Sequence, residues 1–141
     1  MSAKLTLRTD SLSPDLLRRL KTAKNTAPIM ASIGSTLVSL GQRAFTDASL
    51  RPATWAARKV EPKDGHLILQ DETNLRKSLR VTSSSARQVT IGSHLPYAAA
   101  HQLGNPKGNL PARPYLPFLP DGTLTPRANK NVESIIRAAL K

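Results

Sequence analysis

The longest regular pattern in the sequence is an apolar stripe between Pro28 and Phe45. Its members recur at helical spacing and are Ile29, Ile33, Leu37, Leu40 and Ala44. This spacing predicts one long helix with a single apolar face. Such a face must be buried against another element, so this helix constrains the rest of the fold more than any other segment.

Two glycines, Gly34 and Gly41, lie one heptad apart inside this predicted helix. Each glycine costs about 1 kcal/mol of helix propensity relative to alanine. Close approach of another backbone, from the same chain or from a second copy, would offset that cost. Simple tolerance of the two glycines is the plainer interpretation, and it is the one we expect.

Shorter patterns predict the remaining elements. Alternation of polar and apolar residues over 4–8 predicts a strand, and alternation over 79–91 predicts an antiparallel hairpin. Helix starts are expected at Ser13-Pro14 and Thr125-Pro126. A short helix over 97–103 should end at Gly104. The apolar face of the C-terminal helix is predicted to hold Val132, Ile135, Ile136 and Ala139.

The order of these elements predicts an α+β fold in one domain spanning residues 1–141. A small antiparallel sheet packs against the N-terminal helices and the C-terminal helix, with extended loops or arms between elements. Because aromatic residues make up only 4% of the chain, the core should be mainly aliphatic. The helix from Ser13 is expected to stop before Pro28.

Two segments lack helix or strand periodicity. The first, about 46–66, contains several turn signals and basic residues, and it is predicted to be a long basic loop. The second, about 105–125, has a proline at every third position: Pro111, Pro114, Pro117 and Pro120. Apolar residues lie between these prolines and favour burial. We therefore expect a stiff arm that docks on its own domain or on a neighbouring subunit, rather than a ligand for a proline-recognition domain.

The formal net charge of the chain is +12, which predicts an acidic partner such as nucleic acid or an acidic protein surface. The alternative is a basic surface that only keeps the protein soluble. Candidate contacts to DNA or to an acidic partner lie in the basic loop: Arg51, Arg58, Lys59 and Lys63. The chain has few aromatic residues and no recognisable recognition helix, so any DNA contact should be independent of base sequence.

Catalytic and metal-binding patterns have no support in the sequence. The absence of cysteine excludes disulfides and thiolate chemistry, and the histidines do not have the spacing of metal ligands. The acidic residues are scattered, so we predict no enzyme, no cofactor and no metal. His101 is expected to be a hydrogen-bonded structural residue. No apolar run is long enough to cross a membrane, and no secretion signal is expected.

Two motifs resemble those of a known family. Residues 91–104 (IGSHLPYAAAHQLG) and 110–116 (LPARPYL) together resemble the signature of the phage virion morphogenesis, or tail completion, family of Mu-like and P2-like tailed phages. Upstream, 69–79 (LQDETNLRKSL) resembles a second family motif, and Trp55 matches a tryptophan often found before it. Two positions depart from the pattern, because Tyr115 replaces phenylalanine and Asn74 stands where glycine is common. The positions that carry the signature are Tyr97, His101, Gln102, Gly104, Arg113, Pro114 and Tyr115.

The resemblance implies a non-catalytic structural protein of a tailed bacteriophage. It would form a homo-oligomeric ring, with a hexamer as the expected size, at the neck or at the head-proximal end of the tail, where it helps to join tail to head. Its partners would be further copies of itself, adjacent connector, terminator or tail-tube proteins, and DNA passing through the lumen. The protein would be found in the virion, and in the host cytoplasm during assembly.

The motif positions are expected to shape the domain and its contacts. Arg113, between stiff backbone segments, is predicted to lock the proline-rich arm by a hydrogen-bonded ion pair. Two alternatives remain open: a basic DNA-binding module that does not read sequence, and a solitary monomer with a solvated basic face.

Overall fold

A computed structural model describes residues 3–9, 12–55, 73–95, 98–104, 112–119 and 123–140. The strands are β1 (Ala3–Arg8), β2 (Arg80–Ser84) and β3 (Gln88–Ser93). The helices are α1 (Pro14–Leu20), α2 (Ala27–Arg43), the short 3-10 helix η2 (Ala48–Leu50), α3 (Thr73–Ser78), α4 (Ala98–Leu103) and α5 (Pro126–Ala139). This order confirms the predicted α+β class.

The strands form one antiparallel sheet with the order β1-β3-β2. Strand β3 is central: Leu5 of β1 and Val81 of β2 both pair with Ile91. The register of β2 shifts between Val81 and Ser83, which marks an irregularity of the bulge type on that edge. One face of the sheet carries the buried side chains of Leu5, Leu7, Val89 and Ile91, as the alternation in sequence predicted.

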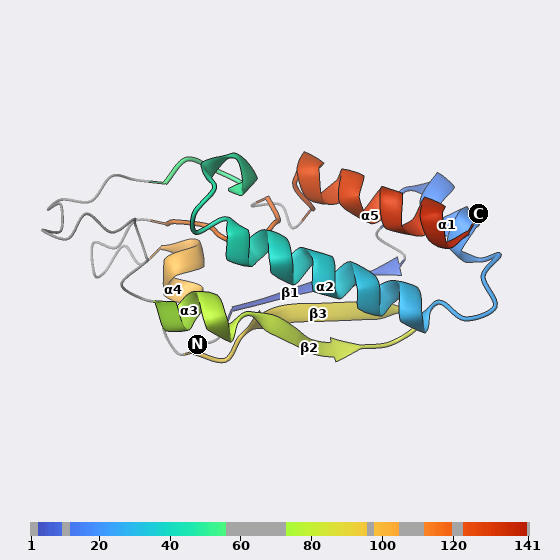
Figure 1. The fold of residues 1–141 in the computed structure, drawn as a ribbon, viewed down its shortest axis with the longest axis horizontal. Coiled ribbons are helices and arrows are strands. Elements are labelled where there is room, and N and C mark those ends of the chain that lie inside the picture. Colours follow the sequence, from blue (N-terminus) through green and yellow to red (C-terminus); the bar gives the residue numbers. More distant parts are fainter. Residues whose placement is uncertain are drawn as a thin grey trace, which may run out of the picture.

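Helix α2 lies at the centre of the packing. It contacts the β2–β3 hairpin on one side and α5 on the other (Figure 1). The predicted stripe of α2 is buried, with Ile33 wholly and Leu37 almost wholly removed from solvent. In α5, Val132 and Ile136 are buried as predicted and Ile135 is partly buried. The prediction for Ala139 is wrong: it is exposed in the last turn of the helix, and Ala128 in the first turn is buried instead.

Gly34 brings α2 into close contact with the sheet. A Cβ atom built at this position would lie 2.5 Å from Cγ2 of Val89 and 3.0 Å from Cγ2 of Val81. Both valines are branched at Cβ and have restricted χ1 rotamers, so moving either side chain away would cost energy. Simple tolerance of Gly34 was therefore the wrong expectation: the residue is small because strand side chains occupy the space beside it.

Local sequence signals set most of the element boundaries. The hydroxyls of Ser13 and Thr125 accept hydrogen bonds from the backbone N–H groups of Leu16 and Ala128, which caps α1 and α5. Gly104 follows α4 with a φ of 80°, in the left-handed region that favours glycine. The predicted basic loop contains η2 within its described part, which the turn signals did not indicate.

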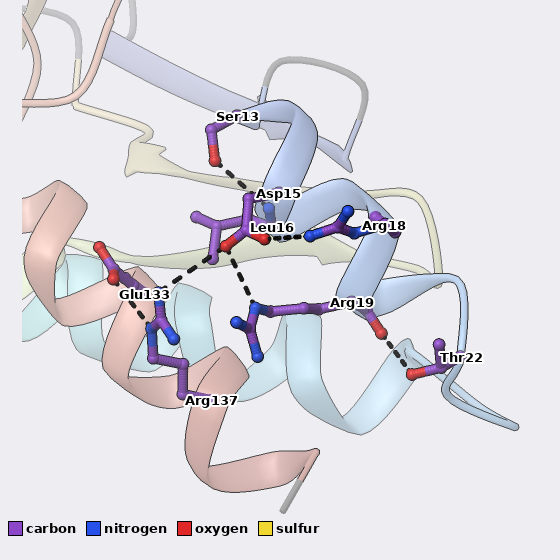
Figure 2. A network of polar contacts seen from close by, with 8 residues as sticks. All are labelled: Ser13, Asp15, Leu16, Arg18, Arg19, Thr22, Glu133 and Arg137. Atoms are coloured by element: carbon purple, nitrogen blue, oxygen red, sulfur yellow. Dashed lines mark hydrogen bonds and ion pairs between the residues drawn. The ribbon is translucent and has the colours of Figure 1, made fainter.

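A polar network joins α1 to α5 (Figure 2). Asp15 pairs with Arg18 at 2.6 Å and Arg19 at 3.1 Å on its own helix, and Arg137 of α5 approaches the same carboxylate at 3.7 Å. Arg137 also donates a hydrogen bond to Glu133 at 2.8 Å. Hydrogen bonds from Arg19 and then Arg18 hold the pKa of Asp15 below its ordinary value of 3.8. The network links the first helix to the last, in a partly exposed setting.

Replacing Gly34 with alanine should destabilise the protein by about 1–2 kcal/mol, because overpacking outweighs the gain in helix propensity. Gly41→Ala is the matched control. Its new Cβ would meet Cδ1 of Leu79 at 3.3 Å, the end of a flexible side chain, so its stability should lie within about 0.5 kcal/mol of wild type or above it. Urea denaturation measures both. Equal stability of the two variants would show that α2 does not approach the sheet as closely as described.

Asp15→Asn should lower the melting temperature at neutral pH. Because folding lowers the pKa of this carboxyl, the folded state binds fewer protons, and the stabilisation is present above about pH 4. It is lost as the pH falls through the lowered folded-state pKa. The difference in melting temperature between variant and wild type should therefore shrink below pH 4, and also in 1 M salt at neutral pH. A difference independent of both conditions would contradict the network.

Candidate functional site

The two halves of the family-like motif meet in space. Residues 112–119 form an irregular segment, called here the docked arm, that lies against α4. The side-chain oxygen of Gln102 accepts hydrogen bonds from the backbone N–H groups of Tyr115, at 2.9 Å, and Leu116, at 3.0 Å. The backbone N–H of Arg113 donates to the carbonyl of His101 at 2.8 Å. One side chain and one helix carbonyl thus satisfy backbone donors of an irregular segment that is largely buried.

Tyr115 anchors the docked arm in the core. Its ring is fully buried, and its hydroxyl donates a hydrogen bond to the carbonyl of Ala98 at 2.8 Å. Burial raises the pKa of this phenol far above its ordinary value of 10.0, so it stays protonated and acts as a donor. The tyrosine that departs from the phenylalanine of the family pattern therefore adds a hydrogen bond to the same packing position.

Three of the described aromatic residues pack together at this site. Phe45, just beyond the end of α2, packs at 5.3 Å from the Tyr115 ring and edge-on at 5.9 Å from the Trp55 ring. The indole N–H of Trp55 donates to the carbonyl of Pro114 at 2.6 Å. The core is otherwise mainly aliphatic, as expected. This aromatic cluster fastens the arm to the C-terminal end of α2.

Arg51 has a structural position in the same cluster. Its guanidinium stacks 3.6 Å from the centre of the Trp55 ring, and its Nε and Nη2 atoms donate to the carbonyls of Ala44 and Phe45. Burial lowers the pKa of Arg51, with the charge of Asp47 partly opposing the shift. The side chain caps the end of α2. Its predicted contact with DNA or an acidic partner stays a prediction, and Arg58, Lys59 and Lys63 lie outside the described residues.

The remaining motif residues act in packing where the structure describes them. The side chains of His101, Gln102 and Arg113 are at most 9% exposed, Gly104 ends α4, and Pro114 is half-buried. Tyr97 lies outside the described residues. The ion pair predicted for Arg113 and the assembly contacts of this set stay predictions. Phe45 was not predicted as a site residue, because its only signal in the sequence is its place at the end of a predicted helix.

One apolar side chain of this region faces solvent. Leu103 in the last turn of α4 is 68% exposed, and no other large hydrophobic residue in the described part of the chain is exposed to that degree. It borders a groove of about 280 Å³, whose other walls include Pro52, Ala112 and Phe118. The groove therefore lies between the segment that follows η2, the end of α4 and the docked arm.

The described residues hold no group of histidines and acids that could bind a metal ion. Within the same ranges, no helix is long and apolar enough to cross a membrane.

The model of the phage virion morphogenesis family matches residues 9–141, and the chain belongs to this family. It is a phage virion morphogenesis protein, and proteins of this family are structural and generally not enzymes. The chain is similar to the Mu-like prophage FluMu G protein 2 of Haemophilus influenzae, with 33% identity over 99 residues, which cover 67% of each protein. No solved structure matches it. The comparisons confirm the resemblance inferred from the motifs.

Replacing Gln102 with methionine should destabilise the protein by about 2–4 kcal/mol, because two buried N–H groups lose their acceptor while the side-chain volume is kept. The matched control is Tyr115→Phe, which removes one hydrogen bond and restores the residue of the family pattern. That variant should lose about 1 kcal/mol. Thermal and urea unfolding measure both. A Gln102→Met variant as stable as Tyr115→Phe would show that the side-chain oxygen does not hold the arm.

Proposed function

We propose that this protein forms a homo-oligomeric ring at the neck, or at the head-proximal end of the tail, of a tailed bacteriophage and helps to join tail to head. The observation that carries the proposal is the family match over residues 9–141, together with motif residues that pack an arm onto a helix. The ring acts as a structural part and converts no substrate. Its neighbours are connector, terminator or tail-tube proteins, and a hexamer is the proposed size.

The groove beside Leu103 is the proposed contact between copies. An exposed leucine next to other apolar walls is costly in water, and subunit contacts normally bury such residues. A ring requires two different faces that meet head to tail. The docked arm gives this face a fixed backbone, so little ordering is needed when a second copy binds.

Leu103→Lys tests the contact directly. The side chain is exposed, so the variant should fold with wild-type stability but shift the oligomer toward monomers in analytical ultracentrifugation and native mass spectrometry. Ser35→Lys, exposed in the middle of α2, is the control for an added surface charge. A Leu103→Lys protein that assembles like wild type would exclude this groove as the contact.

A phage that lacks the gene tests the place of action. Negative-stain images should show full heads and finished tails that remain separate, and supply of the wild-type protein should restore joined, infectious particles. Supply of Leu103→Lys should restore few of them. Normal virions without the protein would reject the proposed role. The alternative, a basic module that binds DNA alone, predicts no separation of heads from tails.

A further inference from the structure

The face of the sheet that points away from α2 is polar and positively charged. The residues of β1 that alternate with buried Leu5 and Leu7 are Lys4, Thr6 and Arg8, and all three are exposed. Lys4 pairs with Gly92 from one side, and Arg80 of β2 pairs with the same glycine from the other. The next row joins Thr6, Thr90 and Ser83. These residues are called the basic sheet face.

Lys4 and Arg80 lie on either side of Gly92, which has no side chain to separate them. Neighbouring strands lie about 4.8 Å apart, so Lys4 and Arg80 stand about 10 Å apart across the glycine, and no side chain of β3 separates them. The hydroxyls of Thr6 and Thr90 lie 2.8 Å from each other in the adjacent row. Thr90 of the central strand is buried, whereas Lys4, Arg80, Thr6 and Ser83 are exposed, so ammonium, guanidinium and hydroxyl groups share one surface on the two outer strands.

The acidic side chains that the structure describes lie with the helices and not on this surface. The acidic residues of the described chain are Asp15, Asp47 and Glu133, in or beside helices. Asp15 and Glu133 are paired with arginines of α1 and α5, and Asp47 accepts hydrogen bonds from Ser49. Among the described outward positions of the sheet there is no acidic residue. Among the described residues, no carboxylate pairs with Lys4 or Arg80 on this face, which gives that part of the sheet a positive potential.

We propose that the basic sheet face binds the phosphodiester backbone of duplex DNA without reading its bases. Lysine, arginine, serine and threonine are among the side chains that contact DNA phosphates. The outward positions named above carry no apolar or aromatic side chain, so the face lacks the apolar centre of a protein interface and the stacking rings that favour single strands. The proposal goes beyond the proposed function, which names no DNA contact, and places such a contact on the sheet.

The test compares two double variants of equal charge. Lys4→Gln with Arg80→Gln removes the two cations beside Gly92, and Lys21→Gln with Lys24→Gln removes two exposed cations from the turn between α1 and α2. Fluorescence anisotropy with a short labelled duplex gives the binding constant of each protein over a series of salt concentrations. Equal melting temperatures of the variants confirm that both remain folded.

The sheet variant should lose about one unit of the logarithmic salt slope for each cation removed. When the salt concentration rises from about 50 to about 200 mM, the fold-loss of DNA affinity should therefore be roughly ten times smaller for the sheet variant than for wild type. The control variant should keep the wild-type slope. Equal losses in the two variants, or a wild-type slope in the sheet variant, would overturn the proposal.

The same variants would also show whether this face binds an acidic protein and not DNA. If the sheet variant bound DNA like wild type but failed to join tails to heads, the face would meet an acidic protein, and the proposal would be wrong. The DNA measurement does not depend on ring formation. Normal virions without the gene would therefore reject the proposed function while leaving a Lys4- and Arg80-dependent DNA affinity intact.

Discussion

The contact of one face of α2 with both the sheet and the docked arm is the constraint on which the structure depends. At Gly34 the helix touches the side chains of the β2–β3 hairpin, and one heptad later Gly41 faces Leu79 and Leu116. The same helix face thus meets the sheet first and the docked arm afterwards. Since interiors are close-packed, a helix set further from the sheet would also move away from the arm.

The docked arm shows how an irregular segment can be buried. Pro114 and Pro117 have no N–H to satisfy, and the donors between them, on Tyr115 and Leu116, are both accepted by one side-chain oxygen of Gln102. Restricted backbone angles reduce the entropy lost on ordering. Proline spacing and one glutamine together replace the hydrogen bonds that a strand partner would supply, and they leave a stiff surface beside Leu103.

The described acidic side chains and the exposed cations of the sheet lie in different layers of the fold. The acidic side chains described lie with the helices, where Asp15 and Glu133 are paired to arginines, while the exposed side of the sheet carries cations and hydroxyls. The sequence pointed to the basic loop as the contact with an acidic partner, because the cations of that loop are close along the chain. In the fold Arg51 of that loop stacks on Trp55, whereas Lys4 and Arg80, distant in sequence, flank one glycine.

The sequence by itself determined the fold class, the hairpin, the caps at Ser13 and Thr125, and the left-handed Gly104, because periodicity and capping act over a few residues. It also carried the family motif. Only the tertiary structure decided that Gln102 meets the arm, that Phe45 joins Trp55 and Tyr115, and that α3 forms at all. Those outcomes require segments far apart in the chain to come together, and a six-residue helix is stabilised by its packing rather than by its own propensity.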